Sequence, residues 1–421
     1  MLRWIFFIII YVLLGIYTLQ ALKTATRYPW AQYLFIAISV LVLGNFIYQF
    51  TWGEAQGRVL SRPKSYAFGM LIAAVVFQVV TIFFLFSEDI FRTVSAGYQK
   101  FTGNTREFSL PERRKFLSLL GLGIAALPFG ALLYGMFKGK YNFQVLQYSL
   151  EFDDLPDAFD GYRITQISDI HSGSFDNRKK IEYAVDLINQ QQGDVILFTG
   201  DMVNNLASEM NPWADLFSTL EAKDGKFSVL GNHDYGDYVD WETEELKRQN
   251  LEDLKILERN IGFDLLLNEN RYLQKGNDRI ALIGVENWGR GGFKKAGDLQ
   301  KATTDIDAKD FKILMSHDPS HWEDVVIHED LHYHLTLSGH THGMQFGIEI
   351  PGWVKWSPAS WRYKYWAGIY KEKGQFINVN RGLGFLGYPG RVGIWPEISV
   401  ITLKKGNGSS TGCANHRNGS G

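Results

Sequence analysis

The sequence predicts an α-helical membrane region followed by an α/β domain. Long charge-free apolar runs fill the first third of the 421 residues. From residue 141 onward, short β-type runs alternate with amphipathic helical ones, which is the pattern of an α/β layered domain. Polar side chains gather where the expected strands end. We therefore expect a membrane region at 1–140, an α/β domain at 141–405 and a disordered polar tail at 406–421.

Four apolar runs in the first region are long enough to cross a membrane, which takes about 20 helical residues. They are Trp4–Leu22, Trp30–Gly53, Ser65–Ser87 and Phe116–Phe137. None of them holds a charged residue, and an ion pathway usually needs one, so we expect anchoring rather than transport. The first run lacks the short apolar core and small-residue cleavage site of a signal peptide.

Basic residues in the short loops predict the orientation of the spans. Placing the first and third loops in the cytoplasm puts eight positive charges there, against about six in the reverse arrangement. This bias sends the large domain to the extracytoplasmic side. The stretch Arg113-Arg114-Lys115 also resembles a twin-arginine export signal. Such signals normally stand near the N-terminus, so a basic anchor on the fourth span is the simpler interpretation.

Charge is divided unevenly along the chain. Through residue 142 there are 14 Lys and Arg against 5 Asp and Glu, which leaves 29 basic and 40 acidic residues afterwards. The resulting net charge of −11 on the second part argues against a nucleic-acid surface. The single cysteine, Cys413, permits no disulfide framework, so the compartment cannot be read from cysteine usage.

Apolar runs and periodicity define the expected elements of the α/β domain. The expected strands are 162–168, 194–198, 227–230, 279–285, 312–315 and 334–337, and the expected helices are 178–191 and 242–261. Ligands of α/β folds bind where strands end and loops begin, so we expect the functional side chains at the strand ends.

Two histidines at one strand end are placed one residue apart, in Ser338-Gly339-His340-Thr341-His342-Gly343-Met344. Alternate side chains of an extended segment point to the same side, so His340 and His342 can face one point in space. The glycines beside them allow the backbone to come close to a bound ion. A polar turn with two solvated imidazoles is the alternative for this stretch alone.

Four other strand ends carry similar donors, and this favours a metal site. They hold Asp169 and His171, Asp201, Asn232 and His233, and His317. Five such ends in order are hard to explain as solvated turns.

The motifs SDIH, GDMV, GNHD, SHDP and GHTHG resemble, in this order, those of the calcineurin-like metallophosphoesterases. The resemblance spans about Asn142–Leu403. With the apolar region, the chain resembles the membrane-anchored bacterial branch of that family, and Arg381–Leu403 fits its C-terminal end. The resemblance implies a four-layer αββα sandwich of two mixed β-sheets. It also implies a metal-dependent phosphoric ester hydrolase at the bacterial inner membrane.

The resemblance further implies two divalent metal ions. Asp169, His171 and His342 would hold one, Asn232, His317 and His340 would hold the other, and Asp201 would bridge them. Imidazole, carboxylate and amide donors suit Mn, Fe or Zn, whereas pure Mg sites prefer oxygen alone. Two such ions about 3.5–4 Å apart can polarise a phosphoryl group and hold a bridging hydroxide as the nucleophile.

His233 is expected to act without binding a metal, by protonating the leaving oxygen or stabilising the transition state. Asp234 either orients His233 or caps a turn. Arg290 and Arg391 either bind a substrate phosphate or are structural surface arginines. Met344 replaces the second glycine that many relatives carry after the last motif, and its side chain could narrow the substrate entrance.

The other histidines carry less weight. We expect His334 on a strand surface, His321, His328 and His332 on helices or loops, and His416 in the tail.

The stretch Trp353–Tyr370 holds four Trp and three Tyr. These side chains favour a membrane–water interface, so we expect contact with the membrane or with a lipid substrate. A lid or a packed loop over the metals is the alternative.

Several functions compete for this sequence. The intact ligand set favours hydrolysis of a phosphoester or pyrophosphate bond, with a lipid or cell-envelope molecule as the natural substrate. The specific alternative is a UDP-diacylglucosamine pyrophosphatase of lipid A synthesis, which would act on the cytoplasmic face and conflict with the expected orientation. A non-catalytic sensor would lack a ligand or His233, and a transporter would carry charges inside its spans. The oligomeric state is not predicted.

Overall fold

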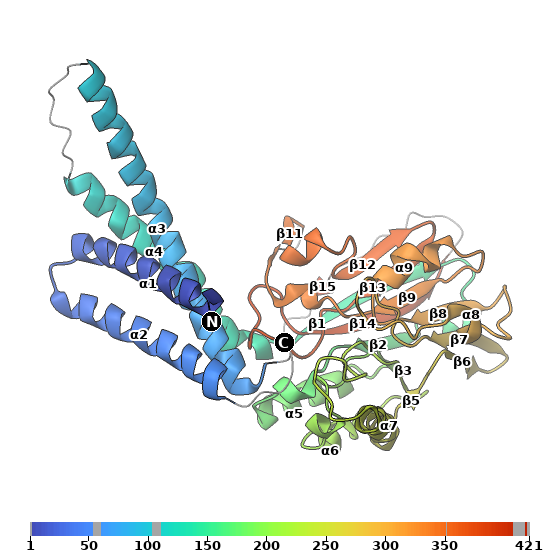
Figure 1. The fold of residues 1–421 in the computed structure, drawn as a ribbon. Helices are drawn as coiled ribbons and strands as arrows, with labels where there is room; N and C mark the ends of the chain where they lie inside the picture. The colour runs from blue at the N-terminus through green and yellow to red at the C-terminus, as the bar shows by residue number, and fades with distance from the viewer. Residues whose placement is uncertain (1, 54–59, 103–110, 351, 407–416, 419–421) are drawn as a thin grey trace. The chain divides into compact units, whose positions relative to one another are not determined.

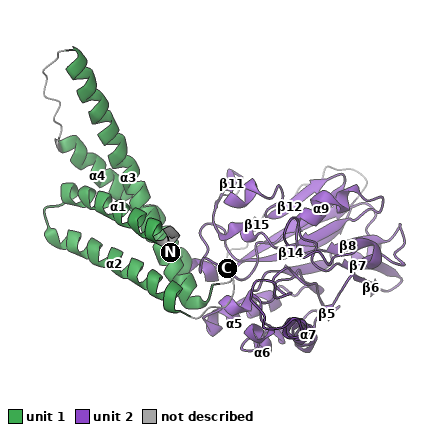
Figure 2. Ribbon diagram, viewed as in Figure 1, with its two compact units in different colours: residues 1–55, 60–137 green, residues 56–59, 138–421 purple. Residues whose placement is uncertain are grey.

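The computed structural model describes residues 2–53, 60–102, 111–350, 352–406 and 417–418. The chain divides into two compact units (Figure 2), one formed by 1–55 with 60–137 and the other by 56–59 with 138–421. Most of the predicted tail, including Cys413 and His416, lies outside the described residues.

The first unit consists of four long apolar helices (Figure 1). They are α1 (Leu2–Ala25), α2 (Pro29–Trp52), α3 (Arg62–Thr102) and α4 (Pro111–Phe137). Each is long and apolar enough to cross a membrane. Large side chains such as Leu41, Phe83 and Leu127 are exposed on these helices. So much exposed apolar surface is unfavourable in water but favourable in lipid. The four helices therefore agree with the predicted membrane region.

Helix α3 is longer than the apolar run predicts. It has 41 residues, whereas the run stops at Ser87, and the added turns begin with Glu88 and Asp89. Arg113 Nη2 lies 2.9 Å from Glu88 Oε2, and Arg114 Nη1 lies 2.6 Å from Asp89 Oδ1. The twin arginines at the start of α4 therefore pair with acids of α3. Apolarity marks the part of a helix that fits the bilayer, not the point where the helix ends.

The second unit is built on two mixed β-sheets and a hairpin. The seven-stranded sheet has the order β15 (Arg417–Asn418), β1 (Gln144–Phe152), β14 (Glu397–Lys405), β2 (Arg163–Ile167), β3 (Val195–Phe198), β4 (Lys226–Ser228) and β5 (Asp264–Leu265). The six-stranded sheet has the order β12 (Gly368–Glu372), β13 (Gln375–Val379), β9 (Leu335–Ser338), β8 (Phe311–Met315), β7 (Asp278–Gly284) and β6 (Glu269–Lys275). The hairpin pairs β10 (Ile348–Ile350) with β11 (Val354–Trp356).

Alternation along the strands places the core. In β3, Val195 and Leu197 face the second sheet, where they pack in one cluster with residues such as Ile280. Ile196 and Phe198 face outward and pack against helices. These helices are α5 (Arg178–Asn189), α6 (Ala214–Phe217) and α7 (Glu244–Ile261), while α8 (Leu299–Ala302) and α9 (Ser320–Asp324) belong to the second sheet's outer side. The layers are therefore αββα, and the predicted fold is confirmed.

Local signals set the ends of α7. The Thr243 side chain accepts a hydrogen bond from Leu246 N at the start of α7, and Gly262 ends this helix with φ of 98°. Short 3₁₀ turns fill several connections. They are η1 (Gly139–Tyr141), η2 (Asp157–Phe159), η3 (Ser172–Ser174), η4 (Ala207–Met210), η5 (Val326–His328), η6 (His342–Gln345) and η7 (Pro358–Trp361).

Candidate metal centre

The candidate site is built from the loops that follow β2, β3, β4, β8 and β9. Five of its residues have backbone φ in the left-handed region, which non-glycine residues rarely adopt: Asp169, His171, Asp201, His340 and His342, with φ from 46° to 69°. Such a conformation costs about 1–3 kcal/mol per residue and persists only where the surroundings impose it. Because several residues of these loops adopt an unfavourable backbone conformation, the loops are shaped to place their side chains rather than to maximise stability.

Two glycines allow the loops to approach each other closely. A Cβ at Gly339 would lie 1.9 Å from Ser168 Oγ and 2.2 Å from Asp169 Oδ2. A Cβ at Gly231 would lie 2.2 Å from Asp201 Oδ1. Only glycine fits at these two positions without moving a carboxylate.

Asp169, His171 and His342 form one group of donors whose ligand atoms lie within 4.8 Å of one another. His342 Nε2 is 3.1 Å from Asp169 Oδ1 and 3.0 Å from His171 Nε2. All three residues are buried. The three donor atoms therefore converge from loops more than 170 residues apart along the chain.

Asp201, His317 and His340 form a second group with the same convergence. His317 Nε2 is 3.2 Å from Asp201 Oδ2, and His340 Nδ1 is 2.8 Å from Asn232 Oδ1. Asp201 Oδ2 is also 3.6 Å from His171 Nε2 of the first group. Asp201 thus lies between the two groups.

Hydrogen bonds behind these donors orient them. His317 Nδ1 lies 2.7 Å from the Thr199 carbonyl, which only accepts, so Nδ1 donates. The other ring nitrogen, Nε2, is buried and faces the Asp201 carboxylate. Asn232 Nδ2 donates to the Tyr238 hydroxyl at 2.8 Å, which leaves Oδ1 facing His340. These arrangements fit a cation and are the partners that metal ligands usually have.

The electrostatics of the site also favour bound cations. Burial alone would lower the pKa of the His317 imidazole, but the Asp201 carboxylate raises this pKa to about 10. Burial alone would raise the pKa of Asp201, yet His317 and His233 hold it well below its usual value. A centre that retains a proton so firmly at a buried imidazole attracts positive charge.

His233 lies beside both groups, and its backbone N–H donates to Asp201 Oδ1 at 2.8 Å. Its Nδ1 lies 2.8 Å from the Asn204 carbonyl, and its ring contacts His171 edge-on at 4.9 Å between centroids. Asp234 does not orient His233. Its carboxylate accepts hydrogen bonds from the backbone N–H of Asp201 at 2.9 Å and of Gly231 at 2.8 Å, so it ties two site loops together as a turn-capping group.

The two candidate arginines do not face the metal groups as substrate ligands. Arg290 forms ion pairs with Glu323 and Asp324 at the surface. Arg391 is fully buried, donates from Nε to the Gly384 carbonyl at 2.9 Å, and has Nη2 3.2 Å from His342 Nδ1. Arg391 therefore supports a site loop from behind, and the expectation of a surface arginine is wrong for it.

One of the other histidines departs from its prediction. His334 was expected on a strand surface, but it is buried and stacks on Phe311, with Nε2 2.8 Å from Asp154 Oδ2. His321 is buried too, and its Nδ1 lies 2.8 Å from Ser316 Oγ.

Sequence reasoning missed two tyrosines at the site. Tyr363 OH lies 2.9 Å from His340 Nε2, and Tyr238 OH accepts from Asn232. Tyr363 belongs to the aromatic stretch, which contains buried and exposed rings in turn: Trp366 is buried, whereas Trp353 and Trp361 are exposed. Met344 is also exposed, beside the turn that carries His342.

Comparison with known proteins agrees with this geometry. Residues 162–344 match the calcineurin-like phosphoesterase family, and residues 2–140 match the family described as "Probable Calcineurin-like phosphoesterase, transmembrane domain". The chain is therefore a metal-dependent phosphoesterase of the calcineurin-like class. More specifically, it belongs to the members that carry a four-helix transmembrane region ahead of the phosphoesterase domain.

Similar proteins carry related names. The uncharacterized metallophosphoesterase YkuE of Bacillus subtilis is 29% identical over 304 residues, which cover 70% of this chain and 98% of that protein. The transmembrane protein with metallophosphoesterase domain of Danio rerio is 26% identical over 67% of this chain and 62% of its own length. The structure of a dimetal phosphatase from Danio rerio matches with a TM-score of 0.31 and 12% identity, over 53% of this chain and 88% of that chain.

Proposed function

We propose that this protein is a membrane-anchored phosphoesterase with two divalent metal ions, which hydrolyses a phosphoester or pyrophosphate bond on a lipid or cell-envelope molecule. The observation that carries the proposal is the convergence of seven donors into two adjacent groups with Asp201 between them. A single carboxylate so placed fits a bridging ligand.

The residues have distinct roles in this proposal. Asp169, His171 and His342 would hold one ion, Asn232, His317 and His340 would hold the other, and Asp201 would be shared. Bound Mn, Fe or Zn ions would supply Lewis-acid activation of the phosphoryl group and a nucleophile derived from water. His233 keeps Nδ1 on the Asn204 carbonyl, so Nε2 is the ring position from which a proton can pass to the leaving oxygen.

The membrane region supports the substrate class and the location. A phosphoesterase tied to a bilayer meets membrane-borne phosphates at high local concentration. In the bacterial inner membrane that we infer for this chain, loop charges favour the phosphoesterase domain on the extracytoplasmic side. The UDP-diacylglucosamine pyrophosphatase alternative requires the opposite orientation. A non-catalytic sensor is disfavoured because every expected donor and His233 are in place.

The test replaces Asp201 with Asn in the full chain purified in detergent. Bis(p-nitrophenyl) phosphate with added Mn²⁺ is the substrate, and bound metal is counted after gel filtration. We expect a rate loss of about 100-fold or more and loss of at least one metal ion, because the amide removes the shared charge. Asp157→Asn, at an exposed position in η2, should keep the wild-type rate and metal content. Unchanged hydrolysis in Asp201→Asn would defeat the proposal.

A further inference from the structure

The β10–β11 hairpin has its apolar side outward, the reverse of the usual pattern in water. Ile348 pairs directly with Trp356 and Ile350 with Val354, so these four side chains share one face. Ile348, Ile350 and Trp356 are exposed on it. Hairpins of soluble domains turn such a face toward the core.

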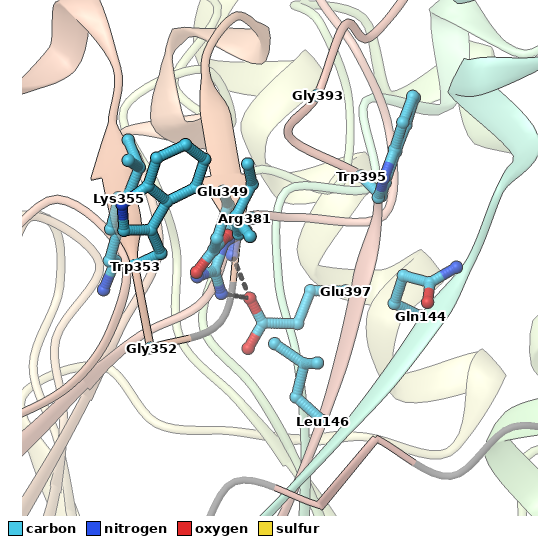
Figure 3. Close-up of a pocket in the computed structure, with 12 residues that line it drawn as sticks. Gln144, Leu146, Glu349, Gly352, Trp353, Lys355, Arg381, Gly393, Trp395 and Glu397 are labelled. Carbon is cyan, nitrogen blue, oxygen red and sulfur yellow. Dashed lines mark hydrogen bonds and ion pairs between the residues drawn. The ribbon is translucent and has the colours of Figure 1, made fainter.

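The polar side of the hairpin is bonded to the rest of the domain instead, although Lys355 keeps part of its surface exposed. Glu349 pairs directly with Lys355 on the opposite face. Glu349 Oε1 accepts from buried Arg381 Nη2 at 2.7 Å, and Arg381 also pairs with Glu397 (Figure 3). The Lys355 ammonium donates to the Ala367 carbonyl. Because these polar groups hold the hairpin in this orientation, the apolar face is fixed outward.

Exposed apolar side chains concentrate in this one place. In the described residues from 138 to 406, nine large hydrophobic side chains are exposed, and six of them lie between Met344 and Trp361. Trp353 and Trp361 are each 79% exposed, and the Trp361 ring lies 6.0 Å from that of Trp356. We name Ile348, Ile350, Trp353, Trp356 and Trp361 the tryptophan face. Patches of this kind mark interaction sites rather than ordinary surface.

The charge around the tryptophan face suits anionic lipid. Residues 344–373 hold five Lys and Arg against two Glu, whereas the chain after residue 142 has a net charge of −11. Basic residues beside Trp side chains are the composition of segments that bind at the headgroup level of a membrane.

A short connection ties the strand beside this face to the last membrane helix. A cavity of about 430 Å³ behind the hairpin is lined by Trp353 and Lys355 on one side and by Gln144 and Leu146 on another (Figure 3). Only six residues lie between Phe137, the last residue of α4, and Gln144. A stretch of this length spans at most about 25 Å when extended. Lipid is therefore the partner within reach.

The same segment is bonded to the metal loop. Ser357 Oγ donates to the Gly343 carbonyl at 2.6 Å, and Thr341 Oγ1 donates to the Trp366 carbonyl at 2.6 Å. Tyr363 OH lies 2.9 Å from His340 Nε2. The segment that carries the tryptophan face is therefore hydrogen-bonded to the loop that carries two candidate ligands, His340 and His342.

We propose that the tryptophan face docks into the headgroup region of the bilayer that anchors the chain, and so holds the metal centre at the lipid surface. Docking needs only the anchor, whereas presentation of a lipid-borne phosphate to the metals rests on the proposed function. The occupant is the bilayer itself, rather than a second copy of the chain or a soluble partner.

The test uses the full chain with Cys413→Ser in lipid nanodiscs containing phosphatidylglycerol and phosphatidylcholine. A single cysteine, from Trp353→Cys or Trp361→Cys, carries an environment-sensitive fluorophore, and headgroup-proximal doxyl lipid is the quencher. We expect several-fold stronger quenching than at Ile256→Cys, an exposed position on α7. This control lies near β5, at the far end of the sheet from β1. Quenching at both tryptophan sites no greater than at Ile256 would overturn docking, as would self-association without quenching.

A second measurement separates docking from catalysis. Trp353→Ala with Trp361→Ala should reduce quenching at a labelled Ile350→Cys at least twofold while leaving hydrolysis of soluble bis(p-nitrophenyl) phosphate unchanged. If the wild-type chain does not hydrolyse that substrate under Mn²⁺ loading, the proposed function fails and the quenching result still decides docking.

Discussion

Gly339→Ala should disable the metal centre without removing any donor. The new Cβ would lie 1.9 Å from Ser168 Oγ and 2.2 Å from Asp169 Oδ2. Non-bonded carbon contacts settle near about 3.5–4.0 Å, so these atoms must separate by more than about 1 Å. Asp169 also accepts from His340 N at 3.0 Å, so its displacement disturbs both donor groups.

A displacement of this size predicts a large loss of activity. Misplacing a reacting group by about 1 Å costs about 100-fold in rate, and loss of ligand geometry weakens metal affinity about 10- to 100-fold. Overpacking should also cost about 1–3 kcal/mol of stability, a much smaller effect than unfolding of the domain. The assay measures bound Mn²⁺ after gel filtration, hydrolysis of bis(p-nitrophenyl) phosphate, and the melting temperature of the purified full chain.

The matched control is Gly292→Ala. No atom lies within 4 Å of a Cβ built at Gly292, so this variant should keep the wild-type rate and metal content. If Gly339→Ala folds, binds metal and hydrolyses the substrate as the wild type does, then the close approach of the last two loops is not what positions Asp169, and the reasoning is wrong.

Three further predictions concern the metal partner, a buried acid and the topology. Tyr363→Phe removes the hydroxyl beside His340 Nε2 and should weaken Mn²⁺ affinity about 10- to 100-fold. The rate of hydrolysis should recover at saturating Mn²⁺. A Mn²⁺ titration curve identical to that of the wild type would contradict this prediction. Burial, with the nearby Asp234 charge, raises the pKa of the Glu258 carboxyl well above its usual value. The folded state therefore keeps a proton that the unfolded chain releases above about pH 4.3, so this group lowers stability as the pH rises. The melting temperature of Glu258→Gln should exceed that of the wild type by more at pH 8 than at pH 5. Exposed Glu245→Gln is the control and should show no such difference. An equal gain for Glu258→Gln at the two pH values would refute the raised pKa of Glu258. Alkaline phosphatase fused after residue 406 should be active in intact cells, because the domain is expected on the extracytoplasmic side. If only a fluorescent-protein fusion at the same position is active, the domain lies in the cytoplasm and the predicted orientation is wrong.

The loops of the metal centre were predictable because strand ends share one edge. Asp169, Asp201 and Asn232 each follow a strand of one parallel run, β2, β3 and β4, and parallel strands bring their carboxyl ends together. A motif at each end therefore suffices to predict that the side chains meet. The apolar runs likewise predicted four spans, because length and lack of charge are direct requirements of a bilayer.

Other features depend on contacts between distant residues and could not be read from local pattern. Tyr363 lies 23 residues beyond His340, in a stretch whose aromatic composition suits a core, a lid or an interface equally. His334 alternates as a surface position would, but Phe311 and Phe152 enclose its ring. Arg391 lies in a glycine-rich segment whose local pattern predicts a turn, yet the side chain is buried and donates to the carbonyls of Arg381 and Gly384, in the segment after β13.

The pairing of β1 with β14 determines how the phosphoesterase domain resists mechanical force. Nine residue pairs, from Gln144↔Glu397 to Phe152↔Lys405, run in parallel near the edge of the larger sheet that carries β15. Force between the membrane helices and the domain enters the sheet through β1, the first strand after those helices, and a pull along this strand loads its pairing with β14. The hydrogen bonds of such a pair are loaded together in shear rather than opened one at a time. A tether that enters the sheet at β1 therefore places the load on this strand pair rather than on the loops that carry the candidate metal donors.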